Sequence, residues 1–326
     1  MATPVLELRN LVTAFDTRLG QVRAVDGVSL TLEAGRTLGI VGESGSGKSM
    51  LSLSIMGLVP PPGRVREGQV LLEGVDLRTQ SERQMRSIRG NRIAMVFQEP
   101  MTSLNPVHTV GFQIMEAVRA HHHLPASELK TMAIESLRKV RISAPERRFS
   151  EYPHQLSGGM RQRVMIAMAL ACKPTVLIAD EPTTALDVTI QAQILSLLRD
   201  LQQDTGMAII LITHDLGVVA QCADDVAVMY AGKVVESGSA AAIFEDSQHP
   251  YTLGLMASLP RMDVDVERLL TISGTVPPPF NYPAGCRYNP RCLFATDQCR
   301  HDPPVLESLG DSHRASCWNM PLEQHV

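Results

Sequence analysis

Residues 42 to 49 read Gly42-Glu43-Ser44-Gly45-Ser46-Gly47-Lys48-Ser49 and match the phosphate-binding pattern G-x-x-x-x-G-K-[ST]. The apolar run 37–41 before this loop fits a buried strand, and the run 48–56 after it is compatible with a helix. Glycines let successive backbone N–H groups point into one concavity, and the helix N-terminus adds about half a positive charge toward a phosphate. This strand-loop-helix context favours a nucleotide site over a flexible Gly/Ser turn.

The loop also assigns roles to side chains. We expect Lys48 to reach the β- and γ-phosphates of ATP and Ser49 to ligate Mg²⁺. The loop residues expected to contact the nucleotide are Gly42, Ser44, Gly45, Gly47, Lys48 and Ser49.

Two carboxylates follow a second apolar strand. The run 176–180 ends in Asp180, Glu181 comes next, and Pro182 prevents simple continuation of the strand. Strand ends place side chains at the edge of an α/β sheet, where ligands bind. We expect Asp180 to hold the hydration shell of Mg²⁺ and Glu181 to orient and deprotonate the attacking water. Most Asp-Glu pairs are solvated surface, but the strand and the phosphate loop favour the catalytic interpretation.

A histidine follows a third apolar strand, 208–212. His214 could donate to the γ-phosphate or position the water near Glu181. A lone histidine after a strand is more often structural, so this assignment depends on the other site residues.

A second glycine-rich helix entrance lies in the run 156–163. Ser157 can cap the helix-forming run 160–172, and Gly158 and Gly159 can expose N–H donors. This anion site has no lysine of its own, so we expect its phosphate to come from a partner subunit. Taken alone, the segment would be an ordinary serine-capped helix. Together with the phosphate loop, it indicates that ATP is held between two such domains.

The composition limits the classes of function. The chain has 326 residues, a formal net charge of −4 and 44% hydrophobic residues, which suits a globular protein and argues against a general nucleic-acid binder. No run approaches the roughly 20 apolar residues of a membrane helix, and the N-terminus has no signal-peptide pattern. We expect a cytosolic chain that relies on other subunits to span any membrane.

The patterning predicts several layers. Residues 5–32 and 68–72 alternate apolar and polar positions, which predicts an antiparallel β layer beside the nucleotide core. Residues 110–147 predict helices, placed where a membrane subunit could dock. Residues 226–238 predict a pair of strands around the turn Ala231-Gly232.

Four of the six cysteines lie close together near the C-terminus. Cys286, Cys292, Cys299 and Cys317 are spaced C-x5-C-x6-C-x17-C. In a cytosolic protein such a set favours a metal site over disulfides. Zinc sites usually have tighter C-x2-4-C pairs, so zinc, another metal group and free buried thiols all remain open on spacing alone.

These motifs, in this order, resemble those of the ATP-binding subunits of ABC transporters. The resemblance implies an α/β fold with a P-loop NTPase (RecA-like) core, an antiparallel β subdomain and a helical subdomain. It implies that Gln98 contacts Mg²⁺ and takes part in catalysis, that Asp187 lies in a dimer-contact loop, and that Phe15 stacks on adenine. Phe15 is the least specific match, since a single aromatic there could equally belong to the core.

Further segments are similar to the dipeptide and oligopeptide importers of this family. They are residues 99–106, 180–193, 249–252, 274–277 and 286–292. The likeness implies a nucleotide-binding domain over 1–248, with a helical insert over about 99–172, and a C-terminal extension over 249–326. It also implies a [4Fe–4S] cluster on the four cysteines, with structural zinc as the alternative.

The resemblance extends to partners and place. It implies a second ATPase subunit, most simply a paralogue, two transmembrane permease subunits and a periplasmic or extracellular solute-binding protein, with no nucleic acid. We expect the chain to lie peripherally at the cytoplasmic face of the inner membrane and to energise import of dipeptides or oligopeptides. Nickel or glutathione would be alternative cargoes.

Non-transport ABC ATPases are the other alternative. Residues 156–162 match the signature of the family. A chromosome or DNA-repair ATPase would carry a long coiled coil between Gln98 and this signature, and only 57 residues, 99 to 155, lie there. A translation or resistance factor would carry two cassettes in one chain. The single phosphate loop and single signature therefore favour a transporter subunit.

Overall fold

The structure is a computed structural model that describes residues 4–18, 20–98, 103–184, 186–258, 271–310 and 312–322. The chain divides into two compact units. Unit 1 comprises residues 1–5, 33–35 and 79–210, and unit 2 comprises residues 6–32, 36–78 and 211–326. Both units are therefore assembled from segments that are distant in the sequence.

Unit 2 contains an antiparallel sheet with the strand order β2-β1-β4-β5. Its strands are β1 (Leu6–Thr17), β2 (Gly20–Leu32), β4 (Gly63–Leu72) and β5 (Val75–Asp76). The antiparallel layer expected from the alternating pattern is confirmed. Strand β4 begins at Gly63 rather than Gly68, because its polar first half pairs with the end of β1, where Gly63 lies opposite Phe15.

A second set of strands in unit 2 follows the order β11-β12-β10-β9-β3. These are β3 (Thr37–Val41), β9 (Asp225–Tyr230), β10 (Lys233–Ser239), β11 (Glu307–Gly310) and β12 (His313–Ala315). Strand β3 is parallel to β9, and the C-terminal strand β12 is antiparallel to β10. The C-terminal segment thus extends the same sheet that carries the phosphate loop.

The helices of unit 2 connect these strands. They are α1 (Lys48–Met56), α9 (Leu216–Cys222), α10 (Ala240–Glu245), α11 (Pro250–Ala257), the short η3 (Asn289–Arg291) and α12 (Asp297–His301). Three tyrosines, Tyr230, Tyr251 and Tyr288, pack in the core of this unit. The Tyr230 ring meets Tyr251 at 4.7 Å and Tyr288 at 5.2 Å between centroids, both edge to face.

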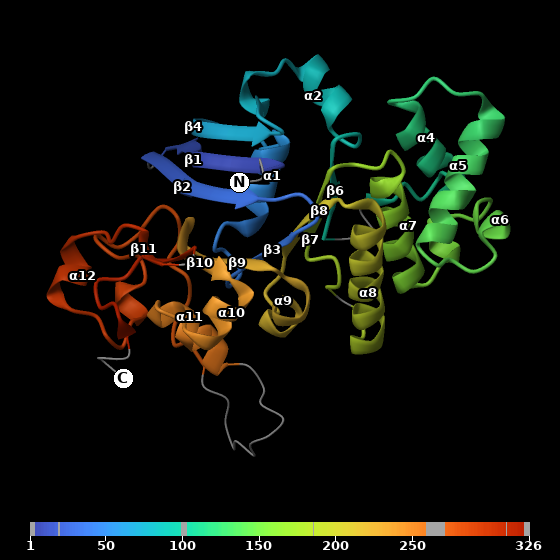
Figure 1. Cartoon of the computed structure of the whole chain (residues 1–326). Coiled ribbons are helices and arrows are strands. Elements are labelled where there is room, and N and C mark those ends of the chain that lie inside the picture. Colours follow the sequence, from blue (N-terminus) through green and yellow to red (C-terminus); the bar gives the residue numbers. More distant parts are fainter. Residues whose placement is uncertain are drawn as a thin grey trace. The chain divides into compact units, whose positions relative to one another are not determined.

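Unit 1 pairs the parallel strands β6 (Ile93–Val96) and β7 (Val176–Asp180) with a group of helices (Figure 1). The helices are α2 (Glu82–Ile88), α4 (Val110–Arg119), α5 (Ala126–Lys139), α6 (Pro145–Arg148), α7 (Gly158–Leu170) and α8 (Val188–Thr205), with η2 (Pro153–Gln155) between α6 and α7. The helices expected over 110–147 are confirmed. The one-turn η1 (Leu77–Thr79) and strand β8 (Ala208–Ile212) lie where the chain passes between units.

The helix packing in unit 1 follows the apolar period of the sequence. Helices α4 and α5 contact each other, and both contact α7. The side chains of Ile114, Leu129 and Leu137 are fully buried at these contacts. No helix within the described ranges is both long and apolar enough to cross a bilayer.

Candidate nucleotide-binding site

The phosphate loop of unit 2 encloses its lysine. The Lys48 side chain is buried, and its Nζ donates to the carbonyl oxygens of Gly42 at 2.6 Å and Glu43 at 3.0 Å. The ammonium also lies 3.3 Å from Ser46 Oγ. A positive charge is therefore held within the curve of the loop, where a phosphate would be bound by the N–H groups around it.

Two glycines allow the loop to lie against its supporting backbone. Gly42 has φ 148° and Gly47 has φ 103°, and Gly47 caps helix α1. A Cβ at Gly42 would lie 2.2 Å from Met229 O, and one at Gly47 would lie 2.6 Å from Ala24 O. Any side chain at either position would force the loop away from this support.

This close approach gives a prediction for stability. Gly47→Ala should lower the free energy of unfolding by about 1–3 kcal/mol, because alanine adopts a left-handed conformation unfavourably and clashes with Ala24. Gly45→Ala is the matched control, since Gly45 also has positive φ, 82°, but open space around its Cβ position. Thermal unfolding of the two variants measures the difference, and equal losses would contradict the steric argument.

The turn of the β9-β10 hairpin is hydrogen-bonded to the phosphate loop. Gly232 N–H donates to Ser46 O at 2.8 Å, and Gly232 O accepts the Asp26 N–H at 2.8 Å. The turn predicted at Ala231-Gly232 is therefore present, and it has a role that the sequence did not indicate. It joins the phosphate loop to strand β2.

Two other expected residues belong to unit 2. Phe15 lies near the end of β1 and is partly exposed, with its ring against Gly63, where a Cβ would lie 2.4 Å from the ring. His214 follows β8 and is exposed. Both are open to solvent, but their contacts with a nucleotide stay predictions.

Unit 1 carries the acidic strand end. Asp180 is the buried last residue of β7, and Glu181 follows it with φ 47°. One carboxylate oxygen of Glu181 accepts hydrogen bonds from Gln98 Nε2 and from Thr184 Oγ1, each at 2.8 Å. The structure thus brings together two expected site residues, Gln98 and Glu181, that lie 83 positions apart in the sequence.

The backbone and hydrogen bonds of Glu181 constrain its side chain. Its backbone is left-handed, which costs about 1–3 kcal/mol for a residue that is not glycine. Hydrogen bonds to Glu181 Oε2 fix the direction of its carboxylate. Thr184 was not a predicted site residue; its place three residues after Glu181 is the only sequence signal for this contact.

The signature segment opens helix α7 of unit 1. The helix runs from Gly158 to Leu170. It begins two residues before the expected run because Ser157 caps it, and it ends two residues before the expected end, with Ala171 at its C-cap. Ser157 Oγ accepts the Met160 N–H at 3.4 Å. Ser157 and Gly158 are exposed, so the first turn presents its N–H groups to solvent.

Asp187 and Gly159 meet at the next helix. Asp187 caps α8, with Oδ1 accepting the Ile190 N–H at 2.9 Å. A Cβ at Gly159 would lie 2.8 Å from Ile190, so a glycine there permits close packing of α7 against α8. Helix α8, which Asp187 caps, thus packs directly against the signature segment, and Asp187 has a structural role in addition to the dimer contact expected of it.

The four C-terminal cysteines of unit 2 line one small pocket with His249, Tyr288 and Trp318. All four are free thiols. Burial raises the pKa of Cys292 to about 11 and that of Cys317 to about 12. Across the described part of the chain, however, no three His, Cys, Asp or Glu side chains are grouped as ligands of a metal ion.

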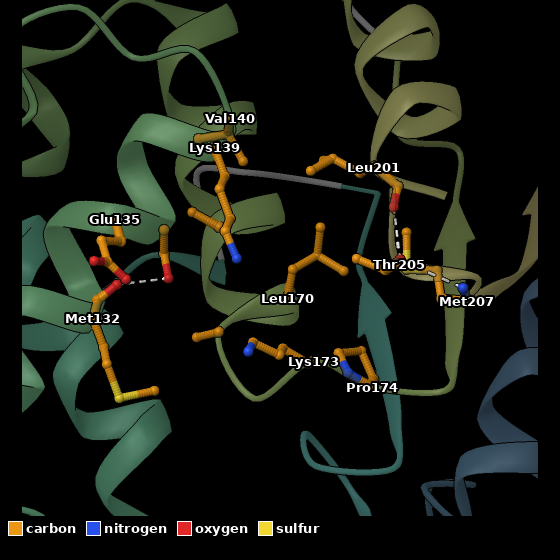
Figure 2. A pocket seen from close by; sticks show the side chains of 13 residues that line it. Met132, Glu135, Lys139, Val140, Leu170, Lys173, Pro174, Leu201, Thr205 and Met207 are labelled. Carbon is orange, nitrogen blue, oxygen red and sulfur yellow. Dashed lines mark hydrogen bonds between the residues drawn. The ribbon is translucent and has the colours of Figure 1, made fainter. Parts of the chain in front are cut away.

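A separate cavity of about 320 Å³ lies in unit 1, and no expected site residue lines it. Figure 2 shows apolar side chains such as Leu170, Leu201 and Met207 with the polar groups of Glu135 and Lys139 near its edge. Thr205 Oγ1 donates to Leu201 O at 2.6 Å. This cavity contains none of the phosphate-binding features described above.

Comparison with known protein families gives two matches. Residues 25–184 match the model described as ABC transporter, and residues 235–299 match the model described as oligopeptide/dipeptide transporter, C-terminal region. The chain is 52% identical to the dipeptide transport ATP-binding protein DppD of Escherichia coli (strain K12), over 98% of this chain and 97% of that one. It is 50% identical to the oligopeptide transport ATP-binding protein AppD of Bacillus subtilis (strain 168), over 96% of both chains.

Solved structures give the same result for the fold. The structure of MJ0796, described as a dimeric bacterial ABC transporter cassette, has a TM-score of 0.65 and 29% identity, over 72% of this chain and 98% of that one. A second MJ0796 structure, described as a post-hydrolysis state bound to ADP and Pi, has a TM-score of 0.65 and 28% identity. The chain therefore belongs to the ABC transporter family, in the group of ATP-binding proteins that includes these dipeptide and oligopeptide transport proteins.

Proposed function

We propose that this chain hydrolyses ATP to drive the import of dipeptides or oligopeptides. The observation that carries the proposal is the enclosed Lys48 ammonium, hydrogen-bonded to Gly42 and Glu43 in the phosphate loop. The peptide cargo is supported by near full-length identity of 50–52% to relatives named for dipeptide and oligopeptide transport.

The proposed roles follow the chemistry of the side chains. Lys48 binds the β- and γ-phosphates, and the loop N–H groups bind the remaining phosphate oxygens. Glu181 accepts a proton from the attacking water, with Gln98 and Thr184 holding its carboxylate in place. His214 acts near the γ-phosphate, and Phe15 stacks on adenine.

Mg²⁺ would be bound by oxygen atoms, which are its preferred ligands. Ser49, Gln98 and Asp180 supply a hydroxyl, an amide oxygen and a carboxylate, and each of these is an oxygen donor of a kind that Mg²⁺ takes. The bound ion would neutralise charge on the phosphates as the bond to the γ-phosphate breaks.

The signature supports a two-subunit ATP site. Ser157, Gly158 and Gly159 provide an exposed helix N-terminus without a lysine, so they suit the phosphates of ATP bound to another subunit. MJ0796 is described as a dimer. We propose a second ATPase subunit, a paralogue, together with two permease subunits and a solute-binding protein, and peripheral binding of this chain at the cytoplasmic face of the membrane.

Transport by the reconstituted complex tests the cargo. Co-purification from membranes identifies the permease subunits and the second ATPase, and these components are placed in vesicles with ATP and the binding protein. Uptake of labelled dipeptides or longer peptides would support the proposal. If the vesicles took up only nickel or glutathione, the proposed peptide cargo would be wrong and that solute would be the cargo. If the ATPase activity did not depend on the permease subunits, the chain would be a non-transport ABC ATPase.

We also propose that the four cysteines hold a [4Fe–4S] cluster. The support is the convergence of Cys286, Cys292, Cys299 and Cys317 on one pocket and the chemistry of four thiols. Structural zinc is the alternative for the same four thiols. Within the described ranges no three potential ligands are grouped as they would be around a single metal ion, so the choice between the two rests on the metal analysis.

Metal analysis of protein purified without air tests this proposal. We expect about four irons per chain and visible absorbance that is lost in air, and we expect Cys292→Ser to reduce both. Cys222→Ser is the control, since Cys222 lies in α9 and does not line this pocket. Stoichiometric zinc without iron would refute the cluster. Protein that contains neither metal, and whose four cysteines all react as thiols in a thiol assay, would refute both metal sites.

A further inference from the structure

The second residue of the phosphate loop, Glu43, is held by the C-terminal segment. Its backbone N–H donates to Tyr251 Oη at 2.8 Å. Its carboxylate forms a two-point ion pair with Arg291, Nη1 to Oε2 at 2.6 Å and Nη2 to Oε1 at 2.9 Å. Because Lys48 Nζ donates to the carbonyl oxygen of the same residue, the position of Glu43 bears directly on the position of the Lys48 ammonium.

Arg291 is itself firmly held. Its side chain is 6% exposed, and that of Glu43 is 30% exposed. The guanidinium lies 5.7 Å from the ring centroid of Tyr230 and 5.9 Å from that of Tyr288, and Nε donates to Ser273 O at 2.8 Å. A two-point Arg–carboxylate pair in such surroundings loses little to screening and fixes both direction and distance.

A second arginine, Arg287, contacts the β9-β10 turn and strand β2, which hold the phosphate loop in place. Arg287 donates to the Asp26 carboxylate and to Ala231 O. Asp26 and Gly232 are joined by a backbone hydrogen bond, and Gly232 donates to Ser46 O. Residues 287–291 therefore make two kinds of contact. Arg287 contacts the residues that support the phosphate loop, and Arg291 contacts the loop itself at Glu43.

We propose that Arg291 is a positioning residue for ATP binding, acting through Glu43 to hold the phosphate loop and Lys48 in their binding geometry. In this proposal Arg291 acts through Glu43, which it binds in the structure, and makes no contact of its own with ATP. The Arg291–Glu43 ion pair keeps the loop ordered in the absence of ATP. Less conformational entropy is then lost when ATP binds, and the affinity for ATP is higher. The proposal rests on the nucleotide site proposed above.

The test compares Arg291→Met with Arg314→Met in the assembled transporter. Arg314 lies on β12 of the same C-terminal segment and is exposed. We expect Arg291→Met to raise KM for ATP about tenfold, equivalent to a loss of about 1.4 kcal/mol, with kcat changed less than about twofold. Arg314→Met should leave both constants unchanged. Arg291→Lys should recover part of the loss, since lysine keeps the charge but not the two-point contact.

Two more variants separate positioning from folding. Glu43→Gln should raise KM to a similar extent, and the double variant with Arg291→Met should be no worse than either single variant, because both break the same contact. Tyr251→Phe keeps the packing but removes the acceptor for Glu43 N–H, and it should also raise KM. These variants serve the same purpose if Arg291→Met does not fold.

The outcomes distinguish this proposal from the one on which it rests. A lower melting temperature with unchanged KM in the folded Arg291→Met variant would show a purely structural role and overturn the proposal. Additive effects of Glu43→Gln and Arg291→Met would do the same. If Lys48→Ala retained full ATP binding, the nucleotide site itself would be wrong, whatever the result for Arg291.

Discussion

Glu181→Gln should nearly abolish ATP turnover while ATP remains bound. General base catalysis contributes about 10²–10⁴-fold to a rate, and an amide cannot take the proton of the attacking water. Glutamine keeps the shape of the side chain and an oxygen that can accept from Gln98 and Thr184. We therefore expect kcat to fall about 10³-fold with little change in ATP affinity, measured by phosphate release and by equilibrium binding.

The same variant reports on the dimer. Since ATP favours the closed dimer through contacts made only in that state, and hydrolysis releases it, the variant should accumulate as an ATP-bound dimer on gel filtration. Glu116→Gln is the matched control, because Glu116 is an exposed carboxylate on α4 of the same unit. Normal turnover in Glu181→Gln would remove the catalytic role assigned to this residue.

The buried strands and their loops were predictable from the sequence. Strands β3, β7 and β8 and helix α1 have the bounds expected from their apolar runs. Each of the three strands is short, fully buried and ended by a glycine, a carboxylate or a polar residue, so local pattern and tertiary environment agree. The start of β4 was missed because Glu67 and Gly68 interrupt the alternation of polar and apolar residues, and pairing with β1 determines the strand there.

Contacts between distant residues were not predictable. The Arg291–Glu43 pair joins residues 248 positions apart, and the Gln98–Glu181 hydrogen bond joins residues 83 apart. Sequence patterns identified Gln98 and Glu181 separately but gave Glu43 no role, because the phosphate-binding pattern leaves that position unspecified. Tertiary packing of the C-terminal segment, in which β12 pairs with β10 and Tyr251 and Tyr288 enter the core, brings it back to the loop.

Lys48→Ala should weaken ATP binding about a hundredfold, because hydrogen bonds to charged groups contribute about 1.5–3 kcal/mol each. The ammonium is buried and has ordered acceptors at Gly42 and Glu43. The Lys48 side chain is therefore already ordered before ATP binds, so it loses little conformational entropy when it contacts the phosphates. Equilibrium titration with ATP and Mg²⁺ measures the loss, and turnover should fall with it.

The matched control for this substitution is Lys139→Ala, since Lys139 is an exposed residue at the end of α5. Lys48→Arg adds a second comparison, because it keeps the positive charge. The guanidinium is larger and planar, and we expect it not to fit where Lys48 Nζ lies 2.6 Å from Gly42 O. We therefore expect Lys48→Arg to bind ATP almost as poorly as Lys48→Ala. Near-normal affinity in Lys48→Arg would mean that charge alone matters, and near-normal affinity in Lys48→Ala would place the nucleotide elsewhere on the chain.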